Sequence, residues 1–127
     1  MIYLPVLKLK TKWFDKWTKK NSVSDGELLK TIENISNNLG TSDLGNGLYK
    51  TRMPRSGQGK SGGFRTIVVF KEAEIAIFVY GFSKNEKENL DKNELKYFKK
   101  LAKDLLKLNH QEIAEMEKEG SFICLKE

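Results

Sequence analysis

Three cationic side chains in the middle of the sequence could together bind a phosphate group. Lys50 and Arg52 alternate along a predicted strand, so both side chains point to the same face. Arg65 begins the next predicted strand, and pairing of the two strands would bring all three cations together with Lys60. Like charges gathered in this way repel one another, and a bound phosphate chain would offset that repulsion.

The segment that joins these strands, RSGQGKSGGFR at residues 55–65, has the composition of a phosphate-binding loop. It contains four glycines, two serines, three cations and no acidic residue, and glycines let a phosphate approach the backbone closely. A nucleoside-triphosphate loop would need a glycine where Pro54 stands and a helix after the loop, whereas a strand follows here. Two interpretations stay open: the loop binds the phosphates of a polynucleotide, or it is a flexible hairpin loop that its cations keep soluble.

Other kinds of catalytic residue are scarce in this sequence. His110 is the single histidine and lies in a late predicted helix, so a histidine pair or a Ser-His-Asp triad is excluded. Cys124 is the single cysteine and lies in an apolar stretch, which predicts a buried packing role and excludes an internal disulfide. The carboxylates between residues 86 and 94 are typical of a helix start rather than a metal cage. We therefore expect no metal, no cofactor, and catalysis by Lys, Arg or Tyr side chains.

The distribution of charge favours a polyanionic partner. The net charge is +6, and no acidic residue occurs between Asp43 and Glu72. The cations in that window are Lys50, Arg52, Arg55, Lys60, Arg65 and Lys71. Small basic proteins commonly bind a nucleic acid or an acidic partner. The C-terminal part carries both signs, as a solvated helical surface does.

Length and hydropathy indicate a single domain over residues 1–127. Of the 127 residues, 39% are hydrophobic, which is enough to bury one modest core. No apolar run approaches the roughly 18–20 residues of a membrane span, and the N-terminal segment lacks the features of a signal peptide. We therefore expect a cytoplasmic protein with no membrane partner.

Helical periodicity and capping motifs predict the helices. Residues 11–20 place three aromatic side chains at helical spacing, as the face of a core or, alternatively, as a platform on which bases stack. A capping box at Ser24 opens a second helix, and a similar motif at Asn109 opens the last one. Another helix begins near Asp91, with its apolar residues inward and its lysines outward.

Period-two patterns predict the strands of one sheet. Residues 2–9 alternate weakly and could form an edge strand, and residues 47–53 form the strand of the first two cations. Residues 64–70 and 75–82 are rich in β-branched and aromatic side chains, which predicts a hairpin buried on much of both faces. Residues 121–127 could add a short last strand. The order of elements predicts an α+β domain with a helix-covered antiparallel sheet.

Three motifs of this chain occur together in one known family. They are Tyr49-Lys50-x-Arg52, the glycine-rich run 57–65 that ends in Arg65, and Tyr80-Gly81-Phe82-x-Lys84-Asn85-Glu86. These residues resemble the RelE/HigB-type toxins of bacterial toxin–antitoxin systems, above all the HigB-like branch that is common in prophages and plasmids. The resemblance implies a RelE-like fold, in which a small antiparallel sheet packs against two N-terminal helices, with further helices at the C-terminus.

The resemblance also implies an activity, a target and a partner. RelE-like toxins enter the ribosomal A site and cleave mRNA there, which inhibits translation. The ribose 2′-hydroxyl attacks the adjacent phosphate without a metal, and preplaced cations stabilise the developing charge. A toxin of this class implies a cognate antitoxin, here expected to be a small helix-turn-helix protein encoded next to it.

By position, the resemblance implies catalytic roles for four cations. Lys50 resembles the strand lysine that orients or activates the nucleophile, and Arg52 resembles a second strand cation that contacts phosphate. Arg65 matches the arginine that stabilises the transition-state charge, and Lys84 follows the last strand, where cations help to protonate the leaving oxygen. Asn85 stands where RelE itself has an arginine. RNA-binding roles are implied for Arg55, Lys60, Ser61 and Tyr80.

Two other functions fit part of the pattern. ParE-like relatives share the fold and inhibit DNA gyrase, but they usually lack converging strand cations such as Lys50, Arg52 and Arg65. A non-catalytic accessory protein that binds RNA or DNA would also use the basic window, and it would show salt-sensitive binding without a cleaved product.

Overall fold

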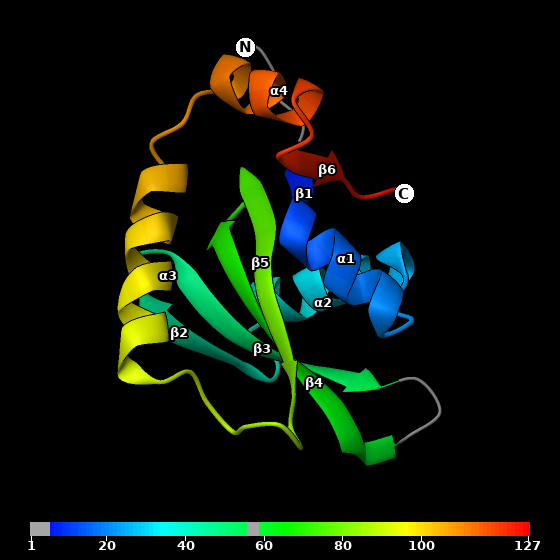
Figure 1. Ribbon diagram of the computed structural model, residues 1–127. Coiled ribbons are helices and arrows are strands. Elements are labelled where there is room, and N and C mark those ends of the chain that lie inside the picture. The colour runs from blue at the N-terminus through cyan, green and yellow to red at the C-terminus, as the bar shows by residue number, and fades with distance from the viewer. Residues whose placement is uncertain (1–5, 56–58) are drawn as a thin grey trace.

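A six-stranded sheet with helices on both faces forms the centre of the protein (Figure 1). The structure is a computed structural model that describes residues 6–55 and 59–127, with the side chains of residues 54–62 outside that description. The strands are β1 (Leu7–Thr11), β2 (Thr41–Gly45), β3 (Leu48–Arg55), β4 (Gly59–Lys71), β5 (Ile75–Ser83) and β6 (Phe122–Cys124). The helices are α1 (Lys12–Lys20), α2 (Asp25–Ser36), α3 (Lys92–Leu105) and α4 (His110–Lys118). The predicted α+β class is confirmed.

The strand order β2-β3-β4-β5-β1-β6 differs in two ways from the expected antiparallel sheet. β1 runs parallel to β5 and antiparallel to β6, so it is an inner strand rather than the predicted edge strand. The inner position lets Leu9 become fully buried. The edge strand β2 was not predicted, because the sequence TSDLG has neither β-branched alternation nor apolar length.

Two hydrophobic cores lie on the two faces of the sheet. On one face, α1 and α2 cover a core that contains Phe14, Ile32 and Val68. On the other face, α3 and α4 cover a core that contains Ile67 and Phe98. Neighbouring residues of β4 enter opposite cores, which confirms that the central hairpin is buried on both faces.

The helices begin where capping motifs predict them. Complete capping boxes join Ser24 with Glu27 at α2, and Asn109 with Glu112 at α4. In each box the side-chain oxygen and the glutamate satisfy backbone N–H groups that have no partner within the helix. The helix near Asp91 starts with a third box. In the described part of the chain, no helix is both long and apolar enough to cross a membrane.

The aromatic face predicted on α1 is only partly a core face. Phe14 is fully buried, and Trp17 packs edge-to-face against Phe64 with ring centroids 5.0 Å apart. Trp13 is 48% exposed, and its ring packs against that of Tyr80. Trp17 also lies over Gly81, where a Cβ would come within 2.9 Å of the indole ring. Close docking of α1 therefore depends on the missing side chain at Gly81.

Gly81→Ala is expected to destabilise the protein by about 1–3 kcal/mol, because the Trp17 indole must shift to admit the methyl group. Gly26→Ala is the matched control, since a Cβ on that α2 residue would meet only Ser24 Oγ, at 3.7 Å. Alanine is the better helix former, so the control should gain up to about 1 kcal/mol. Urea unfolding measures both changes, and equal stability of the two variants would contradict the packing argument.

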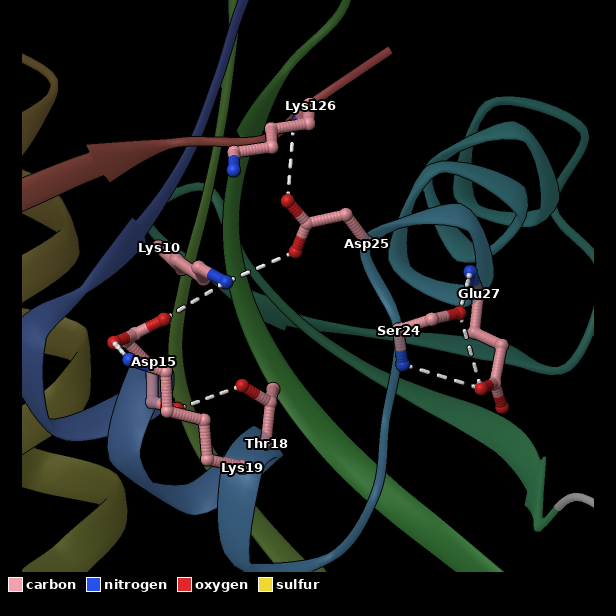
Figure 2. A network of polar contacts seen from close by, with 8 residues as sticks. All are labelled: Lys10, Asp15, Thr18, Lys19, Ser24, Asp25, Glu27 and Lys126. Carbon is pink, nitrogen blue, oxygen red and sulfur yellow. Dashed lines mark hydrogen bonds and ion pairs between the residues drawn. The ribbon is translucent and has the colours of Figure 1, made fainter.

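Lys10 lies at the centre of a polar network that joins β1, α1, α2 and the C-terminal segment (Figure 2). Its ammonium forms ion pairs at 2.9 Å with Asp15 Oδ1 and at 2.9 Å with Asp25 Oδ1, and its side chain is only 8% exposed. Asp15 also pairs with Lys19 at 3.0 Å. Asp25 Oδ2 accepts a hydrogen bond of 2.9 Å from the backbone N–H of Lys126. These contacts fix the two N-terminal helices relative to the sheet.

The network holds its charged members in their charged forms. The hydrogen bond from Lys10 is the main reason that the pKa of Asp15 falls below its ordinary value of 3.8. Burial would raise the pKa of Asp25, but the backbone N–H of Lys126 and the Lys10 ammonium outweigh burial and lower it. Burial likewise opposes the charge of Lys10, yet hydrogen bonds to Asp25 and Asp15 outweigh it and raise the pKa.

Candidate active site

The register of β3 and β4 brings the predicted strand cations together. Arg52 lies directly opposite Arg65, and Lys50 lies opposite Ile67 in the same antiparallel pair. Lys50 and Arg52 share a face with Leu48, which belongs to the core under α3. The cations therefore occupy the part of this sheet face that lies beyond the core.

The three cations line one open cleft of about 370 Å³. The edge strand β2 and the glycine before it supply the other lining residues, which are Gly40, Thr41 and Ser42. Gly40 has a φ of +60°, and its carbonyl accepts a hydrogen bond of 2.9 Å from the Arg52 backbone N–H. This left-handed turn brings the end of the α2–β2 connection against the cations.

The cleft has the charge and the geometry expected of an anion site. Arg52 is exposed and Arg65 is half-buried. Among the described residues, no carboxylate forms an ion pair with Lys50, Arg52 or Arg65. Like charges directly opposite one another across a strand pair destabilise a sheet. A phosphate in the cleft would remove this repulsion and accept hydrogen bonds from both guanidinium groups.

A family comparison decides what kind of protein carries this cleft. A family model described as the RelE toxin of the RelE / RelB toxin–antitoxin system matches residues 7–125. The chain belongs to this toxin family. Membership implies an antitoxin as the partner of this RelE-family toxin, and the mixed sheet with four helices is consistent with the RelE-like fold. A search of curated proteins finds no match to the chain.

The lysine of the cleft is held by a residue that the sequence did not indicate. Lys50 Nζ donates a hydrogen bond to the side-chain oxygen of Asn89, in the connection between β5 and α3. A lysine ammonium has three donors, so this bond orients the group and leaves others for a ligand. Asn89 stands in a polar stretch without a motif, and only the fold brings it to the cleft.

A clamp between Lys87 and Glu94 fixes the connection that carries Asn89. Lys87 Nζ lies 2.6 Å from Glu94 Oε2 and 3.2 Å from the Tyr80 hydroxyl. Burial opposes the charge of Lys87, but its bonds to Glu94 and Tyr80 outweigh burial and raise the pKa of Lys87. The bond from Lys87 is also the main reason that the pKa of Glu94 is lowered. Both groups stay charged, which stabilises the connection next to the cleft.

Lys84 lies at the end of β5, outside the lining of the cleft in this RelE-family toxin. Its backbone N–H donates a hydrogen bond of 3.1 Å to the carbonyl of Gly63, and its side chain is exposed. Phe82, two residues earlier, is the β5 partner of Arg65. Lys84 itself lies in the turn that follows β5, one residue past the end of the strand, and it is not among the residues that line the cleft.

The predicted RNA-binding residues have different positions. Arg55 and Gly59 are partners at the far end of the β3–β4 pair, so this strand pair extends into the loop expected at residues 55–65. The side chains of Arg55, Lys60 and Ser61 lie outside the described part of the structure. Tyr80 packs between Trp13 and Phe98, with ring centroids 4.9 and 5.1 Å away. A base could stack on Tyr80 only if the ring left these contacts.

Cys124 and His110 lie outside the lining of the cleft. The prediction that Cys124 is buried is wrong, because β6 is a short strand at the sheet edge and leaves this side chain exposed. Desolvation and the Glu117 carboxylate, which accepts a hydrogen bond from the thiol, raise the pKa of Cys124 to about 11. The thiol is therefore a poor nucleophile at neutral pH. His110 is exposed at the first position of α4.

Proposed function

We propose that this toxin is a ribosome-dependent mRNA endonuclease that cuts messages in the ribosomal A site and so inhibits translation. The observation that supports the proposal is the convergence of Lys50, Arg52 and Arg65 in one cleft of a RelE-family chain. Such a cluster can stabilise charge on a phosphate, which is the chemistry that cleavage of an RNA backbone requires.

In the proposed reaction, the ribose 2′-oxygen attacks the adjacent phosphorus and the bond from phosphorus to the 5′-oxygen breaks. The 2′-hydroxyl loses a proton and the leaving 5′-oxygen gains one. The products are a 2′,3′-cyclic phosphate and a 5′-hydroxyl end. The phosphorus carries additional negative charge at the transition state, so cations already in place lower the barrier without rearrangement.

The four catalytic cations have different proposed tasks. Arg65 and Arg52 donate to the non-bridging phosphate oxygens, because their opposed positions suit a group held between them. Lys50, oriented by Asn89, acts at the 2′-oxygen. Lys84, in the turn that follows β5, assists protonation of the leaving oxygen. The cationic and polar residues of the β3–β4 loop, Arg55, Lys60 and Ser61, bind the RNA backbone on either side. We leave Tyr80 out of the RNA site because its ring and hydroxyl already have partners.

We also propose that the protein belongs to the HigB-like branch and that its antitoxin is a small helix-turn-helix protein. These details rest on the motifs at residues 49–52, 57–65 and 80–86 rather than on the cleft. A single-domain toxin over residues 1–127 would act in the cytoplasm, where translating ribosomes are found.

Primer extension on a reporter mRNA in a cell-free translation extract tests the activity directly. We expect cuts at in-frame positions when ribosomes are present and none when they are removed. The upstream fragment should end in a 2′,3′-cyclic phosphate, which blocks ligation at that end until the ring is opened and the phosphate is removed. An intact message with normal translation would contradict the proposal. A fall in gyrase supercoiling activity would then indicate a ParE-like inhibitor.

A further inference from the structure

Helix α3 and the two residues that follow it carry a row of lysines that the proposed cleft does not use. Together with Asn46 of the β2–β3 turn, these lysines line a shallow surface cavity of about 740 Å³. The lysines are Lys92, Lys96, Lys99, Lys100, Lys103 and Lys107. We call these six residues the α3 lysine face. Residues 92–107 contain six lysines and two acidic residues, a net charge of +4 within a chain of net charge +6.

The charges of the α3 lysine face are almost uncompensated. In the described part of the chain, one ion pair involves this face, between Lys100 and Asp104 at 3.7 Å. The other acidic residue of the segment, Glu94, already pairs with Lys87. Solvated helices usually intersperse both signs, because a block of one sign repels itself. The face therefore has the charge pattern of a binding surface for an anion.

The neighbouring helix has the opposite charge. α4 contains Glu112, Glu115 and Glu117 and a single lysine, so its net charge is −2. Both helices cover the same face of the sheet (Figure 1). A large polyanion would be attracted to α3 and repelled from α4, which sets how it can approach the protein.

The α3 lysine face begins beside the candidate active site. Lys92 follows three residues after Asn89, the partner of Lys50. Lys99 lies near the β2 edge: a Cβ on Gly45 would be 3.2 Å from its Nζ, and the Asn46 side chain donates to its carbonyl at 3.4 Å. With a rise of about 1.5 Å per residue, the face extends roughly 20 Å away from the cleft. That length exceeds one phosphate contact and fits a run of phosphates.

We propose that the α3 lysine face binds the sugar–phosphate backbone of double-helical RNA, outside the cleft that holds the scissile phosphate. This inference rests on the proposed function, because on the ribosome such RNA surrounds the message. Lysines contact phosphates as point charges without reading sequence. Protein interfaces are depleted in lysine and depend on aromatic or apolar anchors. Leu95 is the only apolar residue that lines this cavity within the described part of the chain, so RNA fits the face better than an acidic protein.

A binding assay with a fluorescein-labelled RNA duplex of roughly 20 base pairs tests this surface. Fluorescence anisotropy measures the affinity at several salt concentrations. The triple variant Lys96→Gln, Lys103→Gln, Lys107→Gln removes three exposed lysines that make no ion pair with a described residue. We expect at least a tenfold loss of affinity at low salt. The slope of log K against log salt should shrink by about 2–3, since each lost phosphate contact contributes about 0.7–0.9.

A matched control removes the same charge from α1, on the other face of the sheet. Lys12, Lys16 and Lys20 are exposed and likewise make no ion pair with a described residue, so each is changed to Gln. The control should keep most of its affinity for the duplex. Equal losses in both triple variants would mean that net charge alone drives binding, and would overturn the proposal. If the α3 variant binds the duplex fully but no longer binds the antitoxin, the face is a protein-binding surface, and the proposal is likewise overturned.

The duplex assay is independent of the endonuclease proposal, because the probe contains no ribosome. If the wild-type protein binds the duplex through α3 but cuts no message, the endonuclease proposal fails and the proposal that the α3 lysine face binds RNA is retained. If the protein does cut, the α3 variant should need a higher ribosome concentration for half-maximal cleavage than the α1 control. An unchanged ribosome requirement, together with unchanged duplex binding, would remove the α3 lysine face from the mechanism.

Discussion

Arg65→Ala is expected to reduce ribosome-dependent mRNA cleavage by about 100- to 1,000-fold, the usual effect of losing one preplaced donor at a developing negative charge. Arg65 is half-buried and faces Arg52 across the β3–β4 pair, so its guanidinium is already in position before RNA binds. Alanine removes this group without adding bulk. The measurement is the rate of primer-extension products in a translation extract supplied with equal amounts of wild-type and variant protein.

Two controls separate catalysis from folding in this experiment. Lys71→Ala removes a cation at the other end of β4, where Lys71 pairs with Glu74 on the exposed turn, and cleavage should stay close to that of the wild type. Thermal unfolding should show that Arg65→Ala is no less stable than the wild type, because it relieves repulsion by Arg52. Full cleavage by Arg65→Ala would remove this residue from the active site. Lost cleavage together with a lower melting temperature would mean that the effect is structural.

Lys10→Met is expected to lower the free energy of unfolding by about 3 kcal/mol at neutral pH. This value is the low end of the range observed when one partner of a buried ion pair is removed. Methionine keeps most of the volume but leaves Asp15 and Asp25 without their shared cation. Their side chains are 14% and 21% exposed and keep other partners, which limits the loss. Urea denaturation of the two proteins measures the difference.

Lys8→Met is the matched control on the same strand and the same face. Lys8 pairs with Glu127 at 2.8 Å, but its side chain is 29% exposed and that of Glu127 is 67% exposed. Exposed pairs contribute about 0–1 kcal/mol, so this change should cost little. Equal losses in the Lys8 and Lys10 variants would show that the buried network has no special role.

Acid should reduce the difference between wild-type protein and the Lys10→Met variant. The pKa values of Asp15 and Asp25 are lower in the folded protein than their ordinary value of 3.8. Their contribution to stability is therefore present above pH about 4 and is lost as the pH falls through the lowered values. The pKa of Lys10 is raised above 10.5, so its contribution persists until strongly alkaline pH. A difference in unfolding free energy that is constant down to pH about 2 would contradict this account.

The sequence by itself determined the features that depend on neighbouring residues. Helix starts at Ser24 and Asn109 follow from side chains that bond backbone groups three residues away. The buried β4–β5 hairpin follows from two apolar runs joined by a short polar turn. The shared face of Lys50 and Arg52 follows from strand alternation alone, whatever the strand pairs with.

Only the tertiary structure decided the features that require distant segments to meet. β1 is an inner strand because β5 and β6, far along the chain, pair with its two edges. Lys10 becomes a buried centre because α1 and α2 bring Asp15 and Asp25 to it. Asn89 reaches Lys50 because the clamp of Lys87 holds the β5–α3 connection against the sheet. Local patterns cannot contain such contacts, since each is set by the register and packing of elements that no short window of sequence includes.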